Sequence, residues 1–202
     1  MRHFILVCLC CFSAVAFADE PLPAFNAIRT EGAFNVQVTM GSAPSVQLKG
    51  DASVGKRISV NVVDGELQVK GTEHVHVIGV DDQVIITLPA LRQFKGKGVG
   101  EVQLKNIDGE RIDIAFEGVG RLEAAGKIKW LRIKGNGVGE INTKKLLAED
   151  ADVDFDGVGG VDLYASNHLN AVVHGVGSVT YYGNPKVVNK SANGIGSITA
   201  GK

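Results

Sequence analysis

The tripeptide Gly98-Val99-Gly100 decides the fold class of this chain, because five related tripeptides follow it. They are Gly118-Val119-Gly120, Gly137-Val138-Gly139, Gly157-Val158-Gly159, Gly175-Val176-Gly177 and Gly194-Ile195-Gly196. Successive first glycines are 20, 19, 20, 18 and 19 residues apart. A fixed period with the same punctuation is typical of stacked repeats. We expect these glycines to be structural corners, since glycine tolerates positive φ and close contact between neighbouring backbones.

Apolar and polar residues alternate on both sides of each tripeptide, which predicts strands. The position four residues before the first glycine holds Phe94, Ile114, Ile133, Val153 and Ala171. The position two before it alternates between Gly96, Phe116, Gly135 and Phe155, so each ring would lie beside a gap. The segment 19–91 also alternates, with a hairpin turn at Asp64-Gly65. No segment has a helical period, and 144–149 is expected to be a turn.

This pattern predicts an all-β protein, and more specifically a right-handed parallel β-helix (solenoid) with coils of about 19 residues. Recurrence of like residues at equivalent positions favours it, because parallel stacking aligns them in continuous rows. The alternative is an antiparallel β-meander or sandwich, in which the glycine tripeptides would be hairpin loops. We expect a single domain over 19–202, with less regular N-terminal coils in 19–91 and regular Gly-Val-Gly coils in 92–202.

The first eighteen residues have the features of a cleaved signal peptide. A short basic start precedes an apolar run, and Ala16-Phe17-Ala18 matches an A-x-A cleavage site. All three cysteines lie within this segment, so the mature chain would contain no disulfide. No later apolar stretch is long enough for a transmembrane anchor. We therefore expect export to the periplasm, or secretion to the cell surface.

The charge balance excludes one class of partner. With 21 basic and 22 acidic side chains the formal net charge is −1, which argues against nucleic-acid binding.

Four aspartates alternate in the segment Asp150 to Asp156, and they form the sharpest candidate site. They could bind calcium, or Asp152 and Asp154 could act as a hydrolase pair, because such neighbours lie ~6.5–7 Å apart along a strand. The repeat alignment instead pairs Arg132 with Asp152, Lys134 with Asp154 and His174 with Asp156. Those cross-strand pairs would fix the register, so we favour this interpretation and predict no metal site.

Tyrosines form a second candidate site. Tyr164 and Tyr182 each follow their tripeptide at the same distance, so stacking would bring their rings together, with Tyr181 beside them. Exposed rings suit sugar faces or partner surfaces, although a structural aromatic ladder is the more common use. His74 and His76 share one strand face as a conceivable zinc pair, but no third ligand is evident.

The glycine corners with flanking F-x-G-V-G strands, preceded by Phe25-Asn26-Ala27-Ile28, resemble the head GIN domain family of auto-transporter adhesins. The segments Gly32-Ala33-Phe34-Asn35-Val36 and Asp64-Gly65-Glu66-Leu67-Gln68-Val69 add to this resemblance, which covers roughly Phe25 to Ala200. The resemblance implies a right-handed β-helix exported by Gram-negative bacteria and a role in adhesion. It offers no catalytic residues.

Two functions from different classes remain open. The first is a non-catalytic secreted or envelope module that binds a glycan or a cell-envelope protein, without any cofactor. Its candidate binding residues are Tyr164, Tyr181, Tyr182, Asp152 and Asp154. The second is a polysaccharide lyase or hydrolase, but the short connections between repeats leave little material for the walls of a cleft. The last repeat would also expose a strand edge, which predicts self-association there.

Overall fold

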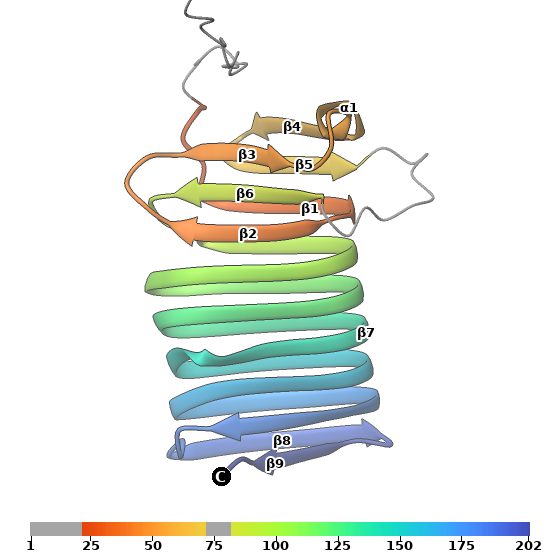
Figure 1. Ribbon diagram of the computed structural model, residues 1–202. Coiled ribbons are helices and arrows are strands. Elements are labelled where there is room, and N and C mark those ends of the chain that lie inside the picture. The colour runs from red at the N-terminus through yellow and green to blue at the C-terminus, as the bar shows by residue number, and fades with distance from the viewer. Residues whose placement is uncertain (1–21, 72–81) are drawn as a thin grey trace, which may run out of the picture.

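The computed structural model describes residues 22–71 and 82–202, and these ranges form one nine-stranded sheet with a single short helix (Figure 1). The N-terminal elements are β1 (Ala27–Ala33), β2 (Asn35–Met40), β3 (Ser45–Lys49), α1 (Val54–Arg57), β4 (Ile58–Val63), β5 (Glu66–Gly71) and β6 (Gln83–Leu88). They are followed by the long β7 (Gln93–Tyr182), by β8 (Val187–Gly194) and by β9 (Ser197–Ala200). The all-β class is confirmed. The expected turn at 144–149 belongs instead to β7, and the sequence analysis missed α1.

The sheet is mixed, in the order β3-β6-β2-β7-β1-β5-β4, with β8 and β9 also paired to β7. Strands β1, β2, β8 and β9 run parallel to β7, whereas the β3–β6 and β4–β5 pairs are antiparallel. This sheet curls into an open half-barrel. The predicted right-handed parallel β-helix with coils of about 19 residues is therefore wrong. The antiparallel meander or sandwich is wrong as well.

The N-terminal strands explain why the prediction failed. The segment before β7 contains none of the glycine tripeptides, and the chain reverses direction there at turns. Asp64 and Gly65 both have positive φ, 51° and 75°, as a tight two-residue hairpin turn requires, and this turn forces β4 and β5 to run antiparallel. The predicted Asp64-Gly65 hairpin is thus confirmed, and it is one of the features that make the sheet mixed.

Within β7, neighbouring repeats lie side by side with their tripeptides aligned. A Cβ atom placed on Gly118 would lie 1.9 Å from the carbonyl oxygen of Gly98, and one on Gly137 would lie 2.1 Å from that of Gly118. Nine of the twelve tripeptide glycines have positive φ, whereas Gly157, Gly177 and Gly196 do not. Both the backbone conformation and the space at Gly118 and Gly137 therefore require glycine.

The core follows the alternation of the sequence. Residues of the inward rows, such as Phe94, Ile114 and Ile133, are at most 1% exposed. Phe155 fills space left by two glycines, since a Cβ on either Gly135 or Gly177 would lie 2.7 Å from its ring. The expected alternation of rings and gaps is therefore observed here.

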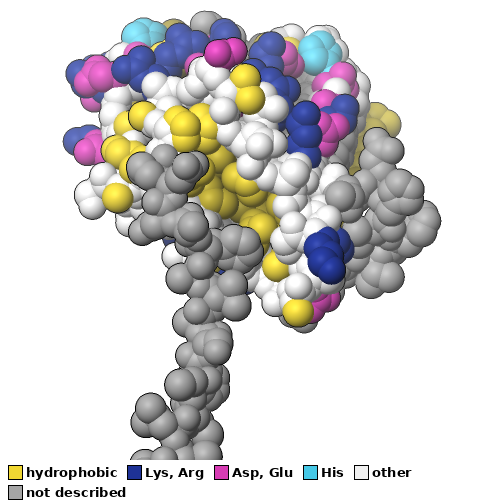
Figure 2. All heavy atoms as spheres, turned by 90° about the horizontal axis from the view of Figure 1, so that it is seen from above, with side chains coloured by type: hydrophobic (Ala, Val, Ile, Leu, Met, Phe, Trp, Pro, Cys, Tyr) yellow, Lys and Arg dark blue, Asp and Glu magenta, His cyan; other side chains and the backbone are white. Residues whose placement is uncertain are grey.

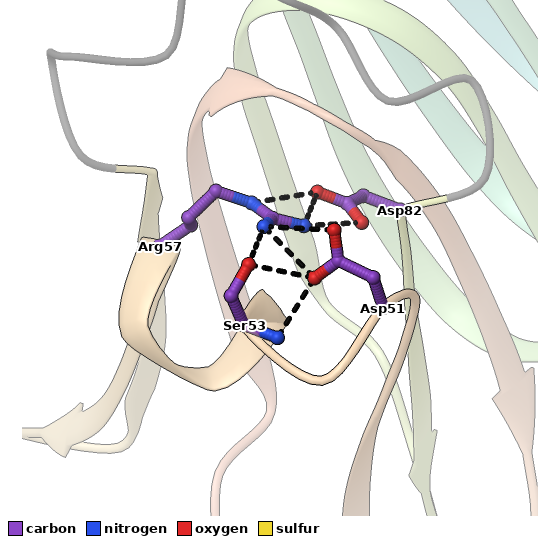
Figure 3. A network of polar contacts seen from close by, with 4 residues as sticks. All are labelled: Asp51, Ser53, Arg57 and Asp82. Carbon is purple, nitrogen blue, oxygen red and sulfur yellow. Dashed lines mark hydrogen bonds and ion pairs between the residues drawn. The ribbon is translucent and has the colours of Figure 1, made fainter.

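A network of ion pairs and hydrogen bonds joins Asp51, Ser53, Arg57 and Asp82 at the N-terminal end of the sheet (Figure 3). Arg57 of α1 donates from Nη2 to Asp82 Oδ2 at 2.6 Å and from Nη1 to Asp51 Oδ1 at 3.0 Å. Asp51 Oδ1 also accepts hydrogen bonds from the backbone N–H and the hydroxyl of Ser53, both at 2.7 Å. Asp82 directly precedes β6, and its backbone oxygen accepts from the N–H of Asn35 at the start of β2. The network therefore ties the loop after β3 to the centre of the sheet.

Partly buried hydrophobic side chains cover the core at the N-terminal end of the sheet. Figure 2, viewed onto the N-terminal end, shows hydrophobic side chains gathered in the middle and charged ones along the rim. Met40, Val46, Leu48, Val60 and Val62 are partly buried hydrophobic residues of this end.

At the other end, Lys190 occupies a position that is inward-facing in earlier repeats. Its Nζ lies 4.9 Å from the Tyr181 ring and donates to the carbonyl oxygen of Ile198 at 3.3 Å. An inward-pointing lysine on an edge strand opposes edge-to-edge pairing. Self-association through the last repeat stays a prediction, with Lys190 as a feature that opposes it.

Candidate binding groove

A surface groove of about 500 Å³ runs across β1 and successive repeats of β7. Two rows of side chains form its walls, and each row comes from equivalent positions of the repeats. The first row lies three residues before the tripeptide position and holds Arg29, Lys95, Ala115, Lys134 and Asp154. The second row lies one residue before it and holds Glu31, Lys97, Glu117, Asn136, Asp156 and His174. We call the space between these two rows the charged groove.

A second hollow of about 230 Å³ continues the charged groove toward the preceding part of each repeat. It shares Lys134, Asp154 and His174 with the first hollow, and Arg132, Asp152 and Asn170 are added to its lining. The floor of the main groove includes Gly96 and Gly135. The missing side chains of Gly96 and Gly135 would point into the core, toward Phe116 and Phe155 respectively, so only their backbone forms the floor between the two outward rows.

The charges of the groove differ along its length. Toward β1 the walls carry four basic side chains and two acidic ones, Glu31 and Glu117, whereas the far end carries Asp154, Asp156 and His174. Some charges are neutralised locally: Arg29 Nε lies 2.8 Å from Glu66 Oε1, and Lys97 Nζ lies 3.3 Å from Glu117 Oε1. The hydrogen bond from Arg29 lowers the pKa of Glu66, so this pair is charged at neutral pH.

Other charged side chains of the groove have no such partner. Within ranges 22–71 and 82–202, no ion pair or hydrogen bond involves the side chains of Lys95, Lys134, Asp154, Asp156 or His174. These groups are therefore available to a ligand.

The predicted aspartate face is split between structural and free groups. The predicted pair is observed between Arg132 Nη2 and Asp152 Oδ2 at 3.0 Å, and Asn170 also donates to Asp152 Oδ1 at 2.7 Å. The predicted Lys134–Asp154 and His174–Asp156 ion pairs are not present in the described ranges. Asp152 is thus engaged by its neighbours, while Asp154 faces the groove without a partner.

Asp150 is likewise engaged. Its Oδ1 lies 2.9 Å from His168 Nδ1 and accepts a hydrogen bond from Asn167 Nδ2, also at 2.9 Å. The hydrogen bond from His168 lowers the pKa of Asp150. In the described part of the chain, no group of three or more His, Cys, Asp or Glu side chains could hold a metal ion.

The predicted tyrosine cluster lies outside the groove. Tyr182 lies beneath Lys144, whose Nζ is 3.6 Å from the ring centroid, and Tyr164 lies against Gly183. Tyr181 packs against the core beside Lys190 instead of joining an exposed stack. The structure therefore brings Asp152 and Asp154 to the groove region, but not the three tyrosines.

An exposed apolar ridge borders the groove. The middle residues of the six tripeptides are 40–80% exposed, and we call them the valine ridge: Val99, Val119, Val138, Val158, Val176 and Ile195. The first glycine of each tripeptide separates this ridge from the second groove wall. Contiguous exposed apolar residues of this kind mark interaction surfaces.

Sequence reasoning missed Lys95, Lys97, Asn136 and the paired Arg29 as groove residues. The signal was present in the same alignment that revealed the inward rows, because the outward rows directly before each tripeptide contain Lys95, Lys97, Lys134 and Asn136. The predicted signal peptide, 1–18, and the histidines His74 and His76 lie outside the described residues. In the ranges that the structure describes, no helix has the length and apolar character needed to cross a membrane.

Fold and surface together define an all-β protein with an open charged groove beside an apolar ridge. The sequence model of the family described as "Putative auto-transporter adhesin, head GIN domain" matches residues 24–185. The chain belongs to this family, as its glycine corners indicated. No curated protein matches the sequence.

Several solved structures are similar to this chain. A protein from Bacteroides fragilis titled a putative adhesin is 21% identical with a TM-score of 0.61, covering 90% of this chain and 94% of that one. A putative lipid binding protein from Parabacteroides distasonis is 16% identical with a TM-score of 0.48, covering 91% and 95%. A putative adhesin from Parabacteroides merdae is 15% identical with a TM-score of 0.47, covering 91% and 94%. The first of these shows a shared fold.

Proposed function

We propose that this chain is a non-catalytic adhesion module that binds an extended ligand, a glycan or a cell-envelope protein, in the charged groove. It would act outside the cytoplasm, in the periplasm or at the cell surface. One observation carries the proposal: a continuous groove crosses several repeats and presents unpaired charges of both signs on a rigid sheet. A regular array of this kind suits a ligand that also extends over several strand spacings.

The family membership supports adhesion, and the groove chemistry supports binding over hydrolysis. A paired-carboxylate hydrolase needs two carboxyl groups that are both free to act on the substrate. Here Asp152 is held by Arg132 and Asn170, so the predicted pair of Asp152 and Asp154 is not free to act on a substrate. The valine ridge beside the groove would add apolar contact area for a bound ligand.

The proposal is tested by obstructing the groove without changing its charge. Asn136 is exposed in the middle of the second wall, and Asn193 is exposed at the equivalent position of the last repeat, outside the groove. We expect Asn136→Trp to abolish retention of glycans on an array and of cell-envelope proteins in a pull-down. Asn193→Trp should leave that retention unchanged. Equal retention by both variants, or none by the unsubstituted chain, would overturn the proposal.

A further inference from the structure

One position in the first groove wall lacks a charged side chain. The wall holds Arg29, Lys95, Lys134 and Asp154, but Ala115 stands between the two lysines. The glycine contacts fix this arrangement, because Gly98, Gly118 and Gly137 lie beside one another and each follows its wall residue by three positions. Ala115 therefore leaves a gap that is flanked on both sides by a lysine.

The gap has the dimensions of a seat for one anionic group. Lys95 and Lys134 are separated by two strand spacings, which places their Cα atoms roughly 10 Å apart. Their long flexible stems allow both ammonium groups to converge above the Ala115 methyl group. Neither lysine has an ion-pair partner within 4 Å in the described ranges, although Lys95 interacts electrostatically with Glu66, which is itself paired with Arg29, and the adjacent Glu117 is engaged by Lys97. Asp154 lies beyond Lys134, so it can compete for Lys134 but not for Lys95.

We propose that the groove binds an extended acidic glycan, with a carboxylate or sulfate group seated over Ala115 between Lys95 and Lys134. This inference rests on the proposed function and names its ligand class. Two ammonium groups provide charge-assisted hydrogen bonds to such an anion. The remaining wall residue nearby, Asn136, offers its amide group to sugar hydroxyls.

The backbone favours a glycan over an acidic peptide. Peptides commonly bind sheets by adding a strand at a free edge. The groove instead crosses the middle of the sheet, where β1 is paired on one side with β5 and on the other with β7. Backbone groups of the groove floor are therefore unavailable, and recognition must come from side chains projecting from the two walls.

The experiment measures binding of polygalacturonate to the purified chain by titration calorimetry at low salt. Its fully methyl-esterified form has the same sugar backbone without charge, dextran sulfate carries sulfates in place of carboxylates, and poly-glutamate carries carboxylates on a peptide. Ala115→Glu places a carboxylate in the seat, and Lys95→Gln/Lys134→Gln removes both cations. Lys127→Gln/Lys186→Gln is the matched control, because both lysines are exposed outside the groove.

We expect binding of polygalacturonate or dextran sulfate, and the stronger of the two identifies the seated anion. Both groove variants should weaken it about tenfold or more, whereas the control pair should not. Equal affinity for the methyl ester, or full affinity in Ala115→Glu, would overturn the anion seat while Asn136→Trp still tests the groove itself. Tighter binding of poly-glutamate than of either polysaccharide would overturn the assignment to a glycan.

Discussion

The repeats of β7 and the strands before them keep neighbouring strands in register by different means. In β7, register comes from glycines whose backbones contact each other directly, as at Gly98, Gly118 and Gly137. In the N-terminal region, it comes from a tight turn at Asp64-Gly65 and from the ion pairs of Arg57. The glycine contacts in β7 leave no room for a side chain. The ion pairs of Arg57 depend instead on the charges of the Asp51 and Asp82 carboxylates. The two regions should therefore respond to different perturbations.

The largest effect is expected from a single methyl group in the β7 repeats. Gly137→Ala would place a Cβ 2.1 Å from the carbonyl oxygen of Gly118 on a residue with a φ of 132°. The backbone of two repeats must then shift, and the strained φ adds to the cost. We expect the free energy of unfolding, measured by urea denaturation, to fall by about 3 kcal/mol or more.

Gly55 of α1 provides the matched control for this prediction. A Cβ there meets nothing within 4 Å, and the residue is helical. Gly55→Ala should leave stability unchanged or raise it by up to ~1 kcal/mol, because alanine restricts the unfolded chain and favours helix. A loss at Gly55 equal to that at Gly137 would mean that the tripeptide glycines have no special role in register.

The period of the glycines was sufficient to predict the β7 repeats but not the sheet as a whole. Alternation identified the inward rows correctly, down to Phe155 filling the gaps at Gly135 and Gly177. It could not reveal that β3 runs antiparallel to β6, since an alternating strand reads the same in either direction, whereas the Asp64-Gly65 turn did predict the antiparallel β4–β5 hairpin. One-turn helix α1 was missed because four residues are too few to show a helical period.

A medium effect is expected from acid in the N-terminal region. Hydrogen bonds from Ser53, together with Arg57, lower the pKa of Asp51 from its ordinary 3.8 to about 2. Because the folded pKa is the lower one, Asp51 stabilises the fold above pH 3.8, and this contribution is lost as the pH falls toward 2. The urea midpoint of the unsubstituted chain should therefore drop more steeply between pH 4 and pH 2.5 than that of Asp51→Asn.

Glu66 and Asp150 also have lowered pKa values, but both are present in the unsubstituted chain and in Asp51→Asn. The difference between the pH profiles of these two proteins therefore reports on Asp51 alone. Asp64→Asn is the control, because asparagine also suits the positive φ of this turn. The urea midpoint of Asp64→Asn should fall with acid as much as that of the unsubstituted chain. Identical pH profiles for the unsubstituted chain and Asp51→Asn would show that the network does not stabilise this end.

The groove was only partly predictable for a related reason. The aspartates were found because four of them alternate within one repeat, where periodicity along the chain reveals them. Lys95, Ala115 and Lys134 belong to three different repeats, and their relation exists only across strands. Aligning the outward rows of the repeats would have placed these three residues side by side. It would not have shown that Lys134 and Asp154 form no ion pair with each other.

The smallest effect is expected from a surface pair in β7, Arg132 with Asp152, whose side chains are 42% and 30% exposed. A double-mutant cycle with Arg132→Ala and Asp152→Ala should give a coupling energy of about 0.2–1 kcal/mol, further reduced by 0.5 M NaCl. The same cycle on Arg57 and Asp82, which are 21% and 10% exposed, should give the larger coupling and the weaker salt dependence. This follows because the less exposed pair is less screened by solvent. If the Arg132–Asp152 coupling proved the larger, charge pairs rather than glycines would hold the β7 repeats in register, and the contrast between the two regions would fail.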